Sequence, residues 1–211
     1  MQFVAHLSAL FDVTLKTESI FRQLEIHAEM IRPHRLNLGD NHAKGLALEG
    51  IRLVKDWLPV AVKDGANLDA RSYMLIASSM GAVAFQKGLG AMHAMSHPCS
   101  SLRGTHHGLT NAVVMPYVLK HNVAAIDAKL AALARYLDLP GQSAASVLDW
   151  VLALRAELGI PHTLKEIGVD ESVLPEAAKM AEHDPSNGGN PVPLKAADYE
   201  GLFRRAIDGT L

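Results

Sequence analysis

Four of the eleven histidines in this 211-residue chain lie within one short segment, at His93, His97, His106 and His107. The residues around them are mainly glycine, alanine and methionine rather than charged residues. Imidazole nitrogens bind zinc, iron and other late transition metals, and they also transfer protons near neutral pH. A single histidine in such surroundings is often an ordinary core residue, but one apolar segment seldom gathers several without a use. The segment therefore predicts a site built from imidazoles.

Two spacings within this segment favour metal binding. His93 and His97 are four residues apart on a predicted helix, so both rings project from one face and are able to chelate one divalent ion. His107 lies in the first turn of a helix that Thr105 is expected to cap. The positive end of the helix dipole there disfavours a positive charge on the ring and leaves a lone pair for a metal. His106 is expected to point elsewhere.

The elements that must position these histidines are predicted to be helices. Apolar residues recur with the helical period along most of the chain, and no stretch alternates long enough to predict a strand. Asn67 is a suitable N-terminal cap, and Pro59 and Pro98 are expected to end helices. The many small residues after Asn67 predict a helix packed closely on all sides. The sequence thus predicts an all-α fold, a helical bundle with helices over residues 45–58, 67–85, 91–97, 105–118, 126–137, 147–158, 171–181 and 196–207.

Composition excludes several classes of protein. Hydrophobic residues make up 49% of the chain, while the net charge is −2 and the basic residues are scattered, so no nucleic-acid partner is expected. Cys99 is the only cysteine, which predicts a reducing compartment, the cytoplasm. No segment reaches the roughly 18–20 consecutive apolar residues that would cross a bilayer, so no membrane association is expected.

Two runs within the histidine segment resemble the signature of the iron-containing alcohol dehydrogenase family. The runs are residues 87–98, KGLGAMHAMSHP, and residues 105–116, THHGLTNAVVMP. Weaker agreement extends from about Gly45 to the C-terminus and includes Ile160–Pro161 and Gly189–Asn190–Pro191. The resemblance implies that residues 45–211 form the helical, metal-binding C-terminal domain of that family. In the family, this domain closes over a nicotinamide cofactor that a separate N-terminal α/β domain holds.

The resemblance also implies an activity and roles for individual residues. The reaction is reversible hydride transfer between a small alcohol or aldehyde and NAD or NADP, with Fe²⁺ or Zn²⁺ acting as a Lewis acid on the substrate oxygen. Two metal-binding histidines of the family fall on His93 and His107. His97, which spacing alone pairs with His93, becomes a catalytic residue that faces the nicotinamide and the substrate. An apolar wall for a small substrate, or else ordinary core, is expected from Phe85, Leu89 and Met92.

The chain departs from the family in its first part. Residues 1–44 match poorly, are too few for a doubly wound sheet and contain no glycine-rich phosphate loop. The chain is therefore expected to lack a dinucleotide-binding α/β domain, to be truncated and to be inactive alone. The family takes two further ligands, an aspartate and a histidine four residues later, from an upstream helix. His27 matches that histidine, which puts Gln23 where the carboxylate belongs; other substitutes would be Glu25, His34, Asp40 and His42.

Two other functions stay open. The first alternative is a degenerate, non-catalytic helical module that retains a partial metal site or a surface for self-association as a homo-oligomer. A metal-dependent hydrolase of unrelated ancestry is the other alternative. Hydrolysis normally needs a general base near the metal-bound water, and no Asp or Glu lies between Gly88 and Asn122.

Overall fold

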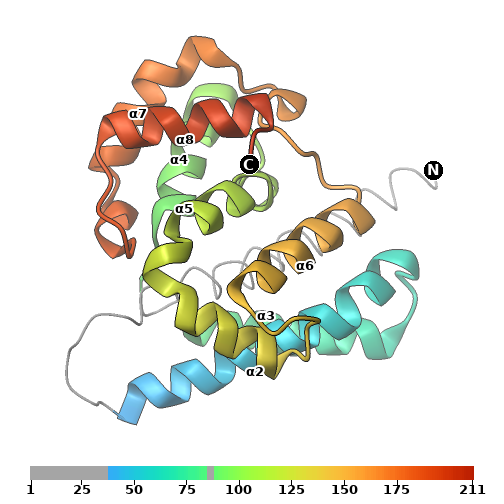
Figure 1. Ribbon diagram of the computed structural model, residues 1–211. Helices are drawn as coiled ribbons and strands as arrows, with labels where there is room; N and C mark the ends of the chain where they lie inside the picture. Colours follow the sequence, from blue (N-terminus) through green and yellow to red (C-terminus); the bar gives the residue numbers. More distant parts are fainter. Residues whose placement is uncertain (1–37, 85–87) are drawn as a thin grey trace. The chain divides into compact units, whose positions relative to one another are not determined.

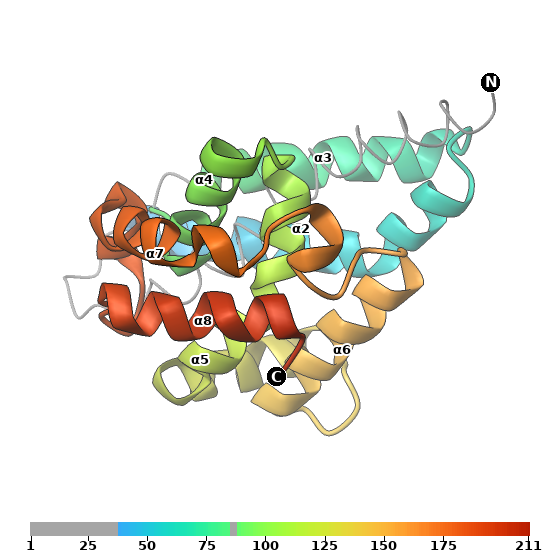
Figure 2. The same cartoon turned by 90° about the horizontal axis from the view of Figure 1, so that it is seen from above.

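The computed structural model describes residues 38–84 and 88–211, with side chains from residue 43 onward, and the regular structure in these ranges is entirely helical (Figures 1 and 2). The predicted all-α class is confirmed. The described residues fall into two compact units, residues 38–84 and residues 88–211. The predicted division at residue 44 falls inside the first described helix and stays a prediction. None of the described helices is both long and apolar enough to span a bilayer.

The first unit consists of α2 (Leu38–Lys63) packed against α3 (Leu68–Ala84). The predicted cap at Asn67 is confirmed, because its side-chain oxygen accepts a hydrogen bond from the Ala70 amide at 3.0 Å. The predicted end of α2 at Pro59 is wrong. A proline removes its own backbone donor and crowds the carbonyl four residues earlier, but buried residues on both sides of it, Leu58 and Ala61, keep the helix packed through that position.

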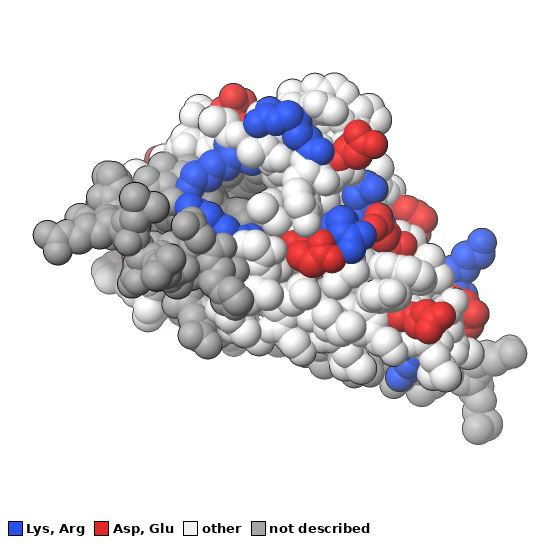
Figure 3. All heavy atoms as spheres, turned by 90° about the horizontal axis from the view of Figure 1, so that it is seen from below, with Lys and Arg blue, Asp and Glu red and all other residues white. Residues whose placement is uncertain are grey.

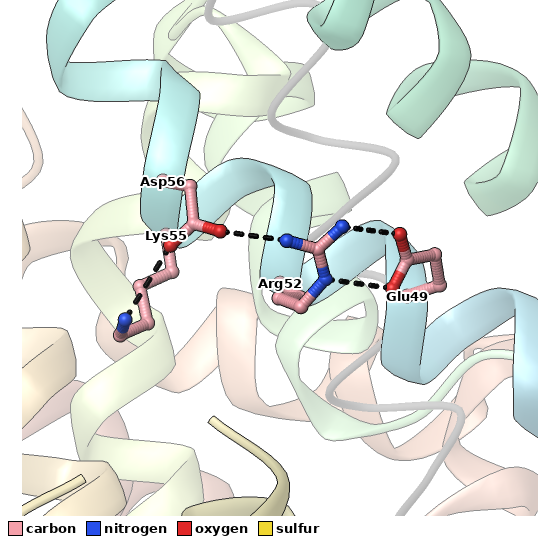
Figure 4. Close-up of polar contacts among 4 residues, drawn as sticks. All are labelled: Glu49, Arg52, Lys55 and Asp56. Atoms are coloured by element: carbon pink, nitrogen blue, oxygen red, sulfur yellow. Dashed lines mark hydrogen bonds and ion pairs between the residues drawn. The ribbon is translucent and has the colours of Figure 1, made fainter. Parts of the chain in front are cut away.

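Charged side chains line part of the outer surface of α2 (Figure 4). Arg52 donates to both carboxylate oxygens of Glu49 at 2.8 and 2.5 Å and to Asp56 at 2.8 Å, and Lys55 lies 3.4 Å from Asp56. Partly exposed pairs of this kind each contribute less than about 1 kcal/mol. These pairs therefore stabilise α2 less than the burial of residues such as Ile51 and Val54 does.

Helix α3 buries only one of its faces. Its buried residues lie at every third or fourth position, whereas Leu75 and Ile76 are 54% and 45% exposed. The predicted burial on all sides is wrong. The small residues of α3 permit a close approach to α2, and α2 covers one stripe of its helical surface.

The second unit carries the histidine segment. Helix α4 contacts α5 and α7, α5 also contacts α6 and α8, and α7 packs on α8. Tyr117, Tyr199 and Phe203 are among the largest fully buried side chains in this unit. The helices are α4 (Ala91–Arg103), α5 (His107–Tyr136), α6 (Ala144–Glu157), α7 (Leu174–His183) and α8 (Ala196–Asp208), with 3₁₀ turns at Lys165–Ile167, Glu171–Val173 and Pro185–Gly189.

Helix α4 is longer than the sequence predicts. It continues through Pro98, where an end was expected, and stops at Gly104, whose φ of 65° lies in the left-handed region. Gly104 donates its amide hydrogen to the Ser100 carbonyl at 2.9 Å, as in a common helix C-terminus. Similarly, the helices expected over residues 105–118 and 126–137 are one 30-residue helix, α5, that contains Pro116.

A pair of buried asparagines fixes the start of α4. Asn122 on α5 and Asn190 exchange two side-chain hydrogen bonds of 2.8 and 3.0 Å. The Asn190 oxygen also accepts from the Ala91 amide at 3.3 Å, which satisfies one of the free donors at the start of α4. Asn190 thus joins the loop before α8 to the first residue of the helix that bears His93 and His97.

This anchor predicts a loss of stability in Asn190→Ala. The substitution leaves the Asn122 amide and the Ala91 amide buried without their partner, and each unpaired buried group costs about 1–3 kcal/mol. We expect urea unfolding to show a decrease in the free energy of unfolding of at least about 1–3 kcal/mol. The double variant Asn122→Ala, Asn190→Ala should lose less than the sum of the two single variants, because it removes both members of the pair. Additive losses would contradict the anchor.

Candidate functional site

Three of the four predicted histidines lie together in the second unit. The ring centroids are 5.2 Å apart for His93 and His107, 5.1 Å for His97 and His107, and 5.9 Å for His93 and His97. His93 is fully buried, whereas His97 and His107 are partly exposed. Helix α4 supplies two of the rings and the first residue of α5 supplies the third. The predicted ligand His27 lies outside the described residues.

Asn111 links two of these rings. Its side-chain nitrogen Nδ2 lies 3.2 Å from Nε2 of His93 and 3.2 Å from Nε2 of His107. An amide nitrogen only donates hydrogen bonds, so both Nε2 atoms accept and both lone pairs point at the same position. The two Nε2 atoms can lie no farther apart than twice that distance, 6.4 Å.

Ser96 completes this network on the other side of His107. Its Oγ lies 3.0 Å from His107 Nδ1 and 3.3 Å from the His93 carbonyl oxygen. Because Nε2 of His107 accepts from Asn111, the hydrogen of the neutral ring is on Nδ1 and is donated to Ser96. Ser96 then donates its own hydrogen to the His93 carbonyl. A hydrogen bond of this kind on the second nitrogen fixes the tautomer of many metal-binding histidines.

These contacts allow a test of whether the residues fit a metal ion. Two buried or partly buried imidazoles direct their Nε2 lone pairs to one position, and nitrogen donors suit iron or zinc. His93 and His107 therefore fit two ligand positions. Within residues 38–84 and 88–211, no group of three or more His, Cys, Asp or Glu side chains is arranged to hold a metal ion. Cys99 is no thiolate donor, because burial raises its pKa to about 12.

His97 has a partner that sequence reasoning missed. Its Nδ1 lies 2.7 Å from Oδ2 of Asp184, while Oδ1 of Asp184 accepts from the Ser186 amide at 2.8 Å. Burial raises the pKa of the Asp184 carboxyl, but the hydrogen bonds from His97 and Ser186 outweigh burial and bring the pKa below its usual value. The ionised carboxylate accepts the Nδ1 hydrogen, which leaves Nε2 of His97 as the basic nitrogen.

His106 has a structural role, and the cap predicted at Thr105 is wrong. Its Nδ1 accepts a hydrogen bond from the Leu109 amide at 3.3 Å, so His106, not Thr105, is the N-cap of α5. Thr105 instead accepts a hydrogen bond from the Thr110 hydroxyl at 2.8 Å. The imidazole of His106 therefore caps the first turn of α5, and the Thr105 hydroxyl bonds to Thr110 instead.

The predicted apolar wall is only partly described. Met92 is buried and Leu89 is partly exposed, while Phe85 lies outside the described residues. The alternative ligands Asp40 and His42 belong to the first turns of α2, but the structure does not describe their side chains. Gln23, Glu25 and His34 lie outside the described residues.

Three residues of the site were not assigned a role from the sequence. Asn111 follows His107 by four residues, which is a spacing that brings side chains together on a helix, so a local signal for it existed. Ser96 precedes His97 directly and carries no such signal. Asp184 is 87 residues away from its partner His97, and only the fold brings the two together.

Comparisons with known proteins place the chain in a family. A family model described as the C-terminal part of the Fe-containing alcohol dehydrogenase family matches residues 39–207. The 4-hydroxybutyrate dehydrogenase of Cupriavidus necator is 37% identical over 174 residues, 78% of this chain and 45% of that protein. The 1,3-propanediol dehydrogenase of Citrobacter freundii is 35% identical over 168 residues, 76% of this chain and 43% of that protein. The chain therefore spans a little under half the length of these relatives.

Solved structures give the same result. The crystal structure of a 1,3-propanediol oxidoreductase matches with a TM-score of 0.84 at 30% identity, over 94% of this chain and 52% of that chain. An iron-containing alcohol dehydrogenase from Thermococcus thioreducens matches with a TM-score of 0.79 at 28% identity, over 94% of this chain and 51% of that chain. These are the relatives that the histidine segment predicts.

The contact between His97 and Asp184 predicts a change of tautomer in Asp184→Asn. The Ser186 amide selects the remaining side-chain oxygen, so the new amide group faces Nδ1 of His97 and the ring hydrogen moves to Nε2. We expect the ¹⁵N chemical shifts of His97 to exchange their protonated and unprotonated character. Glu182→Gln is the matched control, because Glu182 contacts Lys195 and the Ala196 amide. An Nδ1 that remains protonated in Asp184→Asn would show that the carboxylate does not set the tautomer.

Proposed function

This chain belongs to the Fe-containing alcohol dehydrogenase family, and from that premise we propose that it takes part in reversible hydride transfer between a small alcohol or aldehyde and NAD or NADP. One observation carries the proposal: two imidazole lone pairs point at one position, and a third imidazole, His97, lies against them. A site of this kind combines a place for a Lewis acid with a group able to handle a proton.

We assign His93, His107 and His27 to the metal, which would be Fe²⁺ or alternatively Zn²⁺. When bound, the ion supplies Lewis-acid chemistry at the substrate oxygen. His93 and His107 present neutral nitrogens to it, since the contacts with Asn111 and Ser96 place the His107 hydrogen on Nδ1. His27 rests on the match to the family pattern alone.

We assign His97 to catalysis and to contact with the nicotinamide. Oxidation of an alcohol gives up a hydride from carbon to the nicotinamide and a proton from the hydroxyl group. His97 is suited to take the proton, because Asp184 engages Nδ1 and leaves Nε2 basic. Its side chain is 42% exposed, so the proton can pass on to solvent. Asp184 holds the ring in place and stabilises it when it carries the proton.

Small hydroxylated compounds are the substrates to test first. Two of the relatives are named for 4-hydroxybutyrate and 1,3-propanediol, which are short chains with a second polar group. A polyanionic partner such as nucleic acid is not proposed, because the net charge of the chain is −2. On the face shown in Figure 3, acidic side chains lie beside several of the basic ones. Self-association and a cytoplasmic location remain predictions, the second resting on the single cysteine.

We further propose that NAD or NADP is held by a nucleotide-binding half that does not belong to the described residues. Residues 38–84 and 88–211 contain no strand from which a dinucleotide-binding sheet could be built. The second candidate is the non-catalytic helical module, because the chain spans a little under half the length of its relatives. Metal content and activity distinguish the two.

One prediction from the proposed function concerns metal content. We expect His107→Ala, purified anaerobically with Fe²⁺, to retain much less metal than His106→Ala, because only His107 directs a lone pair at the shared position. His106→Ala is the matched control, because it also removes an imidazole from the neighbouring position. Loss of this helix cap should lower the free energy of unfolding by about 1 kcal/mol. Equal losses in the two variants, measured by elemental analysis, would contradict the assignment of His107.

The second prediction concerns activity. We expect no alcohol-dependent reduction of NAD or NADP by the chain alone, and reduction when the nucleotide-binding half of a relative is co-expressed with it. The reconstituted protein should lose activity in His97→Ala. Absorbance of the reduced cofactor measures both, with 1,3-propanediol and 4-hydroxybutyrate as substrates. Suppose instead that the reconstituted protein binds NAD or NADP but retains no metal and does not reduce the cofactor. That result would identify the chain as the non-catalytic module.

A further inference from the structure

Asn111 is fully buried and has an unusual set of contacts. Its nitrogen Nδ2 is shared between the Nε2 atoms of His93 and His107, at 3.2 Å each. Its oxygen Oδ1 is buried and has no hydrogen-bond partner in the part of the chain that the structure describes. A buried polar atom without a partner is costly and rare in native proteins, so this orientation of the amide needs a reason.

The two imidazoles supply the reason. An amide nitrogen has two hydrogens, and here one is available for each Nε2 atom. The opposite orientation would place Oδ1 against both rings, and Oδ1 could accept from them only if both Nε2 atoms carried hydrogens. Protonated in this way, neither Nε2 could bind a metal. The observed orientation instead leaves one oxygen unpaired and keeps both lone pairs available.

We propose that Asn111 is a positioning residue that keeps the Nε2 atoms of His93 and His107 unprotonated and directed at one position before an ion binds. The inference rests on the proposed function for the identity of the ion, but the contacts that carry it belong to this chain alone. Asn111 lies four residues after His107 on α5, so the helix holds the amide beside that ring. His93, on α4, is then tied to the same amide across the two helices.

The distances show that the amide occupies the position where the lone pairs meet. Two nitrogens that bind one ion at about 2.1 Å are no more than about 4.2 Å apart. The limit set by Asn111 is 6.4 Å, twice its distance of 3.2 Å to each ring. A lone pair that accepts a hydrogen bond from the amide cannot bind an ion at the same time, so an ion bound to both rings replaces these two contacts. Until then a hydrogen-bond donor occupies the position.

A purely structural role for Asn111 would have different consequences. A side chain that only fills space would affect stability when it is replaced, but it would not decide which nitrogen of each ring carries the hydrogen. The tautomer of the two histidines in the metal-free chain is therefore the decisive measurement, and affinity for a divalent ion is the second.

The experiment uses the full chain labelled with ¹⁵N-histidine and two variants, Asn111→Leu and Asn111→Ala. Leucine keeps most of the volume and alanine leaves the position open, so a change common to both is not caused by blockage. Thr110→Val is the matched control, because Thr110 is also fully buried on α5 but bonds to Thr105 and the His106 carbonyl. Circular dichroism confirms that each variant is folded.

In the metal-free wild type, above the usual titration range of imidazole, we expect both Nε2 atoms to show the ¹⁵N shift of an unprotonated nitrogen. Both Asn111 variants should give mixed tautomers for His93, and a Co²⁺ titration should show affinity about 10–100-fold weaker than wild type. Thr110→Val should match wild type in both measurements.

Three results would overturn the role of Asn111: protonated Nε2 atoms in the wild type, unchanged shifts in both Asn111 variants, or changed shifts with unchanged Co²⁺ affinity. A wild type that shows the expected shifts but binds no Co²⁺ would instead contradict the proposed function. The comparison of shifts between wild type and variants would then still decide whether Asn111 sets the tautomers.

Discussion

The burial of α4 is the constraint on which the rest of the second unit depends. Residues 91–96 of this helix are all buried, so their backbone amides and the His93 imidazole need partners inside the protein. Asn190 supplies one at the first residue, and Gly104 closes the last turn by turning its amide back to Ser100. Between these ends, Asn111 and Ser96 engage the histidine rings. The fold thus fixes α4 at both ends, and the histidine contacts lie between these ends.

The sequence predicts the helical class because the period of apolar residues is a local property, repeated over most of the chain. It fails at Pro59 and Pro98, because the effect of a proline depends on packing that the local pattern does not contain. One lost backbone hydrogen bond costs less than unpacking the buried residues on either side of it. The helix start at Asn67 is predicted correctly, since the side chain of that residue determines it locally. The end of α4 at Gly104 was not predicted, because Pro98 offered an earlier local signal for an end.

In the candidate site, too, local spacing predicts some residues, while others come together only in the fold. The cluster of His93, His97 and His107 follows from spacing within one segment, and the three rings do lie together. Asp184 could not be predicted, because the chain between it and His97 has to fold before the carboxylate reaches the ring. The exchange of roles between Thr105 and His106 depends on which side chain reaches the first free amides of α5, a matter of rotamers rather than of composition.

Cys99 gives this architecture a built-in probe. The thiol is fully buried two residues after His97, and burial raises its pKa to about 12, so it is almost wholly protonated and shielded while α4 is packed. A thiol-specific alkylating reagent can attack it only when the helix separates from its neighbours. Because no other cysteine competes, the rate of alkylation reports local opening at the histidine helix, separately from global unfolding. Any ligand that stabilises this helix should then slow the labelling of a single atom, Sγ of Cys99.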